Sequence, residues 1–310
     1  MRIIFFGTPD FAVPSLRALL DSEDEVVVVV TQPDRAKGRG RCLAQPPVKE
    51  LAMSRGIPVM QPAGIRTASF YEELSLLRPE AIVVVAYGKI LPSAILKLPP
   101  LGCINVHASL LPSYRGAAPI QWAIIKGEEK TGVTTMLMDE GLDTGDVLLQ
   151  EETWISDEDN AKTLSKRLSE LGAYLLAKTL DGLRKGSLKP RPQTGNPSFA
   201  PPLKKEDGRI DWSLPASRIS GLIRGTYPWP GAFCYLNGDR IVVVKAGVHD
   251  SEEEGPPGRI ESIGPEDVLV STGRGILSII EVKPEGKNSM PAPSFMHGRR
   301  LNEGAFFDVL

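Results

Sequence analysis

The first half of the chain alternates continuous apolar runs with amphipathic stretches. The apolar runs are short and rich in β-branched residues, and they lie at 2–7, 26–30, 82–86 and 103–107. Between them, at about 10–20, 46–55 and 67–78, apolar positions repeat with a helical period. Strands that are covered on both faces have such unbroken apolar runs, so the alternation predicts an α/β fold with a Rossmann-like, doubly wound, mostly parallel sheet.

Two further strands and a long helix complete this predicted domain. The strands are expected at 132–139 and 146–154. A leucine stripe predicts a helix from about 159 to 185, with Ser156 as its N-cap. Residues 186–207 contain five prolines and two glycines without periodicity, which is typical of a linker. We therefore expect an N-terminal domain at 1–185, followed by this linker.

The pattern changes after the linker, where short strands replace the alternation. A short helix is expected near 215–224. The strands that follow it are joined by turns and lie at 232–236, 240–246, 258–263, 267–271 and 276–283. Several short strands at close spacing are typical of a small closed barrel, so we predict a C-terminal OB-like β-barrel domain over 208–310.

Composition and charge indicate a globular protein of the cytoplasm. The 310 residues are 42% hydrophobic and carry a formal net charge of −2, so contact with nucleic acid has to come from local basic patches. The three cysteines (Cys42, Cys103 and Cys234) form no C-x-x-C pair, which fits a reducing compartment. The apolar runs are too short for a signal peptide or a membrane span, so we expect a cytoplasmic protein without membrane attachment.

Several common cofactor motifs are absent from the sequence. The turn after the first strand reads GTPDFA instead of G-x-G-x-x-G, which removes most of the support for a nicotinamide oxidoreductase. No P-loop pattern occurs. The three histidines (His107, His249 and His297) have no ligand spacing to one another or to a cysteine, so we expect no metal site.

An amide and an imidazole interrupt the apolar run at 103–107. Asn105 and His107 are two residues apart near the end of this strand, so both side chains leave the same face. Ligands bind at the carboxyl ends of parallel strands, which is where this pair lies. Cys103 shares the face, but nothing beside it would activate a thiol, and we interpret it as structural.

A glycine-punctuated loop between the next two strands carries three carboxylates, Asp139, Asp143 and Asp146. If one of them returns to the Asn–His pair, it orients the imidazole and favours its charged form. Such a set without a serine or cysteine nucleophile indicates direct transfer of a group to an incoming nucleophile. Asn105 and His107 would stabilise an oxyanion, and an α-amino group would attack readily because it is partly neutral at physiological pH.

These motifs resemble those of the folate-dependent formyltransferases. The resemblance rests on INVHASLLPSYRGAAPIQWAI and TGVTTMLMDEGLDTGDVL, and it extends through RIIFFGTPDFAVPSL, TQPDRAKGRGR, VVAYGKILP, GRIDWS and GRRL over nearly the whole chain. It implies that Asn105, His107 and Asp143 are the catalytic residues of the N-terminal domain. It also implies 10-formyltetrahydrofolate as the formyl donor and the amine of initiator methionyl-tRNA as the acceptor. We expect the enzyme to be a monomer.

Two further groups of residues gain a role from this resemblance. The residues expected to line the folate site are Ser109, Leu110, Leu111 and Pro112, with Tyr87 and Ile90 as apolar walls for the pterin. The loop at 34–49 is rich in glycine and basic residues, which suits close approach to phosphates and base edges. The residues expected to bind tRNA there are Arg35, Lys37, Arg39 and Arg41. A second basic stretch at 184–205 and the C-terminal barrel are expected to assist in holding tRNA.

Two alternative functions remain open at this stage. A formyltransferase with a small acceptor, glycinamide ribonucleotide or a sugar-nucleotide amine, would have no need of the C-terminal half or of the basic loop. A tRNA-binding protein without catalysis would predict a damaged Asn–His–Asp set, whereas all three residues are present.

Overall fold

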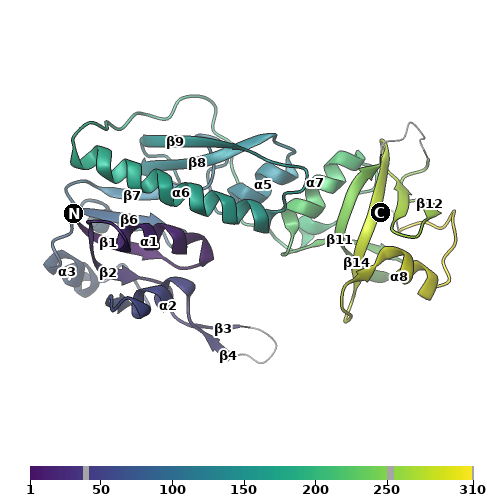
Figure 1. The fold of residues 1–310 in the computed structure, drawn as a ribbon, viewed down its shortest axis with the longest axis horizontal. Coiled ribbons are helices and arrows are strands. Elements are labelled where there is room, and N and C mark those ends of the chain that lie inside the picture. The colour runs from purple at the N-terminus through teal and green to yellow at the C-terminus, as the bar shows by residue number, and fades with distance from the viewer. Residues whose placement is uncertain (38–41, 250–254, 309–310) are drawn as a thin grey trace. The chain divides into compact units, whose positions relative to one another are not determined.

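The computed structural model describes residues 1–37, 42–249 and 255–308. They form two compact units (Figure 1). The N-terminal unit comprises Met1–Pro119, Lys130–Trp154 and Ser165–Pro201, and the C-terminal unit comprises Ile120–Glu129, Ile155–Leu164 and Pro202–Leu310. No helix within the described part of the chain has the length and apolar composition that crossing a membrane requires.

A seven-stranded sheet forms the centre of the N-terminal unit. Its strands, in spatial order, are β5 (Val59–Met60), β2 (Glu25–Val30), β1 (Arg2–Gly7), β6 (Ala81–Val85), β7 (Cys103–His107), β8 (Lys130–Leu137) and β9 (Val147–Trp154). The first five strands pair in parallel, whereas β8 and β9 are antiparallel. The middle strands are buried on both faces, as their unbroken apolar runs predicted. The doubly wound, mostly parallel sheet is thus confirmed.

Helices cover both faces of this sheet. They are the 3₁₀ turn η1 (Asp10–Ala12), α1 (Val13–Leu20), α2 (Pro47–Ser54), α3 (Ala68–Leu76), α4 (Ser93–Leu96) and the long α6 (Ala161–Arg184). The helix α6 approaches β7 closely at Gly172, where an added Cβ would lie 2.8 Å from the side chain of Val106. It therefore covers the Val106 face of β7, which is opposite to the face that carries Asn105 and His107.

The N-cap of α6 differs from the one predicted. The Asn160 side-chain oxygen accepts the main-chain N–H groups of Lys162 and Thr163, and the Thr163 hydroxyl accepts the N–H of Asn160. Ser156 instead lies one turn earlier, in a loop that Asp159 closes by accepting the Ser156 N–H. Ser156 was the wrong choice because this extra turn separates it from the helix.

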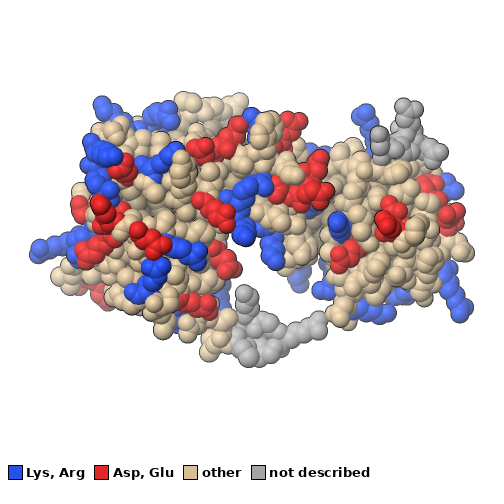
Figure 2. Space-filling model, in the orientation of Figure 1, with Lys and Arg blue, Asp and Glu red and all other residues tan. Residues whose placement is uncertain are grey.

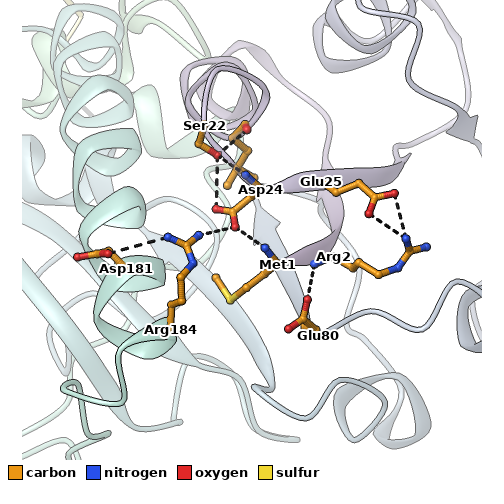
Figure 3. Close-up of polar contacts among 9 residues, drawn as sticks. Met1, Arg2, Ser22, Asp24, Glu25, Glu80, Asp181 and Arg184 are labelled. Carbon is orange, nitrogen blue, oxygen red and sulfur yellow. Dashed lines mark hydrogen bonds and ion pairs between the residues drawn. The ribbon is translucent and has the colours of Figure 1, made fainter.

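An ion-pair cluster ties the sheet to α6 beside β1 and β2 (Figure 3). Asp24 precedes β2, and its carboxylate accepts from the Met1 ammonium at 2.8 Å and from the guanidinium of Arg184 at the end of α6. The Asp24 side chain is only 4% exposed. Burial alone would raise the pKa of Asp24, but hydrogen bonds and charge from the ammonium and Arg184 hold it below its ordinary value.

Substituting this carboxylate should destabilise the N-terminal unit. We expect Asp24→Asn to lower the free energy of unfolding by about 1–3 kcal/mol at neutral pH, since two cations lose their buried partner. A carboxyl whose pKa is lowered by folding contributes stability above its unfolded pKa, and this contribution is lost as the pH falls through the folded pKa. The measurement is urea unfolding of the parent and of Asp24→Asn at pH 7 and at pH 4 and below. The difference between their free energies of unfolding should become smaller as the pH falls.

The matched control is Glu25→Gln, because the neighbouring Glu25–Arg2 pair is exposed and contributes at most about 1 kcal/mol. Equal effects of both substitutions would contradict the assignment.

The C-terminal unit is built on a six-stranded antiparallel sheet. Its elements are α5 (Pro119–Ile125), η2 (Glu206–Gly208), α7 (Ala216–Thr226), β10 (Ala232–Leu236), β11 (Asp239–His249), β12 (Ile260–Ile263), β13 (Val268–Ser271), β14 (Ile276–Pro284), β15 (Met290–Pro291) and α8 (Ala292–Gly298). The strand order is β10-β11-β14-β13-β12, with β15 against β14. Register shifts in β11 and β12 mark bulges that bend the sheet, as a small barrel requires. The sequence predicted this antiparallel β-domain correctly but missed α5, β15 and α8.

Glycines let α7 pack closely on α5 within the C-terminal unit. A Cβ at Gly221 would lie 2.9 Å from the main-chain oxygen of Ile124, and one at Gly225 would lie 2.6 Å from the Ile125 side chain. Arg218 donates to the carbonyl of Lys126 at 2.7 Å, and Arg224 donates to that of Asp159 at 2.9 Å. The unit thus holds together three separate lengths of the chain.

Candidate active site

The strand β7 presents Asn105 and His107 at the carboxyl edge of the parallel part of the sheet. Asn105 pairs with Met136 of β8, and His107, the last residue of the strand, pairs with Thr134. The Asn105 side chain is partly buried and the His107 side chain is only 6% exposed. Cys103 lies earlier in the strand, with burial raising the pKa of its thiol to about 12, which fits a structural role.

The loop between β8 and β9 brings Asp143 to both residues. One Asp143 oxygen lies 3.4 Å from the Asn105 amide nitrogen, and the other lies 3.7 Å from Nδ1 of His107. The second oxygen also accepts the main-chain N–H of Gly116 at 2.9 Å. Of the other two carboxylates, Asp139 accepts from Gly141 and Thr144 within its own loop, and Asp146 is exposed. The structure therefore brings together Asn105, His107 and Asp143.

Hydrogen bonding defines which nitrogen of His107 is available for proton transfer. Nε2 lies 3.0 Å from the carbonyl oxygen of Tyr114. A carbonyl oxygen only accepts, so Nε2 carries the hydrogen in the neutral ring and Nδ1 presents its lone pair on the Asp143 side. A proton taken up at Nδ1 would consequently form an imidazolium facing a carboxylate.

Burial opposes the effect that Asp143 has on the pKa of His107. We expected a neighbouring carboxylate to favour the imidazolium form. Burial lowers the pKa of His107 by more than Asp143 and the Tyr114 carbonyl raise it, so the net direction is downward. The resting site accordingly holds a neutral imidazole that is able to accept a proton.

The main chain after β7 turns sharply at Ser109–Pro112. The Thr134 hydroxyl donates to the Ser109 carbonyl at 2.6 Å and accepts the Leu111 N–H at 3.1 Å. Gln150 donates to the Leu111 carbonyl at 2.9 Å, and the Leu111–Pro112 peptide bond is cis. Ser109 and Leu111 are buried, whereas Leu110 and Pro112 are partly exposed. Side chains of β8 and β9 thus hold this turn in one conformation.

Tyr87 and Ile90 lie in different surroundings. The Tyr87 ring is buried and packs edge-on against Phe6 with 5.0 Å between ring centroids. Its hydroxyl is buried without a hydrogen-bond partner among the described residues, and burial raises its pKa to about 12. Ile90 is 64% exposed. Tyr87 is therefore part of the hydrophobic core around Phe6, and Ile90 is accessible to a ligand.

Two short paired strands lie within the basic loop at 34–49, and Figure 1 shows them beside α2. Its strands are β3 (Arg35–Lys37) and β4 (Cys42–Ala44). Arg35 is exposed, and Lys49 is paired with Asp34 at 2.8 Å. Arg39 and Arg41 lie outside the described residues.

The second basic stretch is partly neutralised. Arg184 is paired with Asp24, and Lys185 is paired with Asp181 at 2.7 Å. Figure 2 shows the wider context, with Lys and Arg interleaved with Asp and Glu over the visible face of the N-terminal unit. This interleaving is consistent with the formal net charge of −2. No group of three or more possible metal ligands occurs among the residues that the structure describes.

Sequence reasoning missed two residues beside the site. The Gln193 side chain contacts the main chain of Asp143, and the Arg115 side chain contacts Gln193. Arg115 follows β7 in the same glycine-containing loop as Gly116, so its position near the site was a usable signal. Gln193 lies in the proline-rich stretch interpreted as a linker, where no local pattern marked it.

Comparison with known proteins identifies the family of this chain. The family model "Formyl transferase" matches residues 1–180, and "Formyl transferase, C-terminal domain" matches residues 202–300. A sugar 3N-formyl transferase, WlaRD, has a similar fold, with a TM-score of 0.70 at 18% identity over 93% of this chain and 99% of that one. The fold and the site thus define a two-domain formyl transferase.

Sequence identity shows to which group of formyl transferases the chain belongs. Methionyl-tRNA formyltransferase from Thermodesulfovibrio yellowstonii is 53% identical over 97% of this chain and 97% of its own. The solved structure of methionyl-tRNA formyltransferase from Clostridium thermocellum has a TM-score of 0.56 at 18% identity, over 80% of this chain and 94% of that one. The chain belongs to the methionyl-tRNA formyltransferase family.

The C-terminal half of the chain does not by itself distinguish a tRNA acceptor from a small one. We took the C-terminal half as evidence against a small acceptor. The sugar formyl transferase covers nearly the whole of this chain, including that half, so the presence of a second domain does not exclude a small acceptor. The acceptor has to be inferred from identity to the methionyl-tRNA formyltransferases instead.

Proposed function

We propose that this enzyme transfers the formyl group of 10-formyltetrahydrofolate to the α-amino group of initiator methionyl-tRNA. The observation that carries the proposal is the meeting of Asn105, His107 and Asp143 at the carboxyl edge of the sheet. Identity of 53% over nearly the full length to a methionyl-tRNA formyltransferase supports tRNA as the acceptor. We also expect the enzyme to act as a monomer in the cytoplasm, where both substrates occur.

The geometry supports a direct transfer without a covalent enzyme intermediate. The substrate amine attacks the formyl carbon, and the negative charge that develops on the formyl oxygen accepts a hydrogen bond from the Asn105 amide. Nδ1 of His107 takes the proton that the amine releases, and Asp143 stabilises the resulting imidazolium. The bond from the formyl carbon to N10 of the folate then breaks, and the imidazolium gives its proton to that nitrogen, which returns the His107 ring to its neutral form. The products are formylmethionyl-tRNA and tetrahydrofolate.

The folate would bind along the turn after β7. Ser109–Pro112 offers main-chain groups held by Thr134 and Gln150, and partly exposed Leu110 and exposed Ile90 offer apolar surface for a pterin. The sugar formyl transferase of similar fold was solved in the presence of 5-N-formyl-tetrahydrofolate, which fits a folate donor for this class.

The tRNA would contact both parts of the chain. We propose that residues 1–185 carry catalysis, that 186–207 connect them, and that the barrel at 208–310 helps to hold tRNA. Arg35, Lys37, Arg39 and Arg41 of the basic loop would contact the acceptor stem, with glycines between them allowing close approach.

Formyl transfer by the purified protein tests this function. Charged initiator tRNA, charged elongator tRNA and free amines are compared as acceptors with 10-formyltetrahydrofolate as donor. We expect efficient formylation of the initiator tRNA alone. Comparable formylation of a small amine would show that the enzyme is a formyltransferase with a small acceptor. Binding of tRNA without formyl transfer would support a tRNA-binding protein without catalysis.

The basic loop gives a separate prediction. We expect Arg39→Ala to lower kcat/KM for charged initiator tRNA by an amount equivalent to about 1–3 kcal/mol, the scale of one specific base contact. Lys37→Ala should instead weaken all tRNAs similarly and reduce the salt dependence, as expected for a phosphate contact. The measurement is kcat/KM for initiator and elongator tRNA at two salt concentrations, with folate affinity as the control. Equal efficiency of Arg39→Ala and the parent would show that the loop is only a solvated charged segment.

A further inference from the structure

We propose that Arg115 and Gln193 form a clamp that positions Asp143 for the reaction. The inference rests on the proposed function, because it assigns to these two side chains a positioning role in the same formyl-transfer site.

The Gln193 amide holds two loops at once. Its nitrogen donates to the carbonyl oxygens of Asp143 and Gly145, each at 2.8 Å. Its oxygen accepts from Nε and Nη2 of Arg115, at 3.2 and 2.7 Å. Both ends of one side-chain amide are thus used, and each end joins a different loop of the site.

The Asp143 loop needs such a restraint. Asp143 has a φ of 53°, a left-handed conformation that costs free energy in a residue with a side chain. The preceding residues of the loop are exposed, among them Leu142 with over half of its surface accessible. A strained, exposed loop keeps one conformation only when its surroundings determine it. The two carbonyls bound by Gln193 belong to the strained residue Asp143 itself and to Gly145.

Arg115 is itself fixed by the stretch of chain that carries Gln193. The Arg115 N–H donates to the Ser198 carbonyl at 2.8 Å, and the Ala200 N–H donates to the Arg115 carbonyl at 2.8 Å. The neighbouring Gly116 has a φ of 126°, and a Cβ there would lie 2.6 Å from the Ala200 oxygen. Residues 193–200 therefore fasten the loop after β7 while Gln193 fastens the Asp143 loop.

The consequence is a fixed distance between Asp143 and the catalytic pair. Gly116 donates to the Asp143 carboxylate, so the loop that Arg115 anchors also orients the carboxylate directly. Releasing Gln193 frees the Asp143 main chain, and the carboxylate then drifts from His107 and Asn105. Misplacement of a reacting group by about 1 Å is enough to cost up to 100-fold in rate.

The test is kinetic analysis of Gln193→Leu in the full-length enzyme. We expect kcat to fall by about 10- to 100-fold while KM for folate and tRNA stays within a few-fold, since Gln193 acts through Asp143. The control variant is Thr194→Ala, an exposed neighbour in the same stretch, which should behave as the parent. In an Asp143→Asn background, Gln193→Leu should add little, because the group that it positions is already absent.

Three outcomes would overturn the clamp, and none of them is confused with failure of the proposed function. If the parent is active and Gln193→Leu has a similar kcat, the clamp is refuted and the proposed function stands. The same holds if the effects of Gln193→Leu and Asp143→Asn on kcat are fully additive. NMR titration of the His107 ring gives a readout that needs no activity. The groups that face His107 are the Asp143 carboxylate and the Tyr114 carbonyl, so loss of the clamp should lower the pKa of His107 further. An unchanged titration in Gln193→Leu would also refute it.

Discussion

Replacing His107 by alanine is expected to lower kcat by about 100- to 1000-fold in a protein that still folds. The ring is the group that takes a proton from the attacking amine, and its Nδ1 faces Asp143 while Nε2 is held by the Tyr114 carbonyl. Asn105→Ala should have an effect of the same order, because loss of one preorganised donor to a developing oxyanion commonly costs about 100- to 1000-fold.

Single-turnover kinetics with charged initiator tRNA measure these effects on the chemical step. Thermal unfolding and far-ultraviolet circular dichroism of each variant establish that the fold is retained. Asn105→Asp tests the role of the hydrogen-bond donor more specifically than Asn105→Ala. It keeps the shape of the side chain and replaces the donor by a second carboxylate beside Asp143. Turnover within a few-fold of the parent in folded Asn105→Ala or His107→Ala would remove the residue concerned from the mechanism.

Asp143→Asn should change both the rate and its pH dependence. The carboxylate stabilises the imidazolium that forms during transfer, so we expect kcat to fall by about 100-fold or more. Asp143 raises the pKa of His107 against the larger effect of burial. Without the carboxylate this pKa falls further, and the neutral, proton-accepting ring persists to lower pH. The acid limb of the kcat/KM profile should therefore move to lower pH even as the rate drops.

The profile is measured for parent and variant from about pH 5 to pH 9 with the same charged tRNA. Asp139→Asn is the matched control, because Asp139 accepts hydrogen bonds only from Gly141 and Thr144 in the contacts described for its loop. An acid limb that stays in place, or that moves to higher pH, would mean that Asp143 does not interact with His107 during the reaction.

The strand that carries the site was predictable because its information is local. A repeat of two residues places Asn105 and His107 on one face of any strand, and the apolar run at 103–107 defines that strand. The antiparallel pairing of β8 and β9 brings Asp143 back to this face, and that step depends on long-range pairing and on one residue with positive φ. Among Asp139, Asp143 and Asp146, only resemblance to a family selected the residue that the structure brings to His107.

Other features depended on contacts that no local pattern records. The neutral state of His107 follows from burial, whereas the sequence shows only which charges are neighbours. Gln193 contacts the site although it lies in residues 186–207, which their prolines and glycines led us to interpret as a linker. The short α5 was missed because Pro119 and the preceding glycine and alanines are typical of a loop.

The make-up of the C-terminal unit limits how the enzyme can be taken apart. A fragment that begins after residue 201 would lack 120–129 and 155–164, which belong to the same compact unit. Gly221 and Gly225 would then leave a bare groove on α7, and Arg218 and Arg224 would lose their carbonyl acceptors. The C-terminal unit is thus not a contiguous segment of the chain that could be separated from the rest as a complete domain. During synthesis, two stretches made early must wait for α7. The hydrogen bonds that join α7 to them span 65 residues (Arg224 to Asp159) and 92 residues (Arg218 to Lys126), and such long separations raise the contact order and favour slow, late completion of this unit.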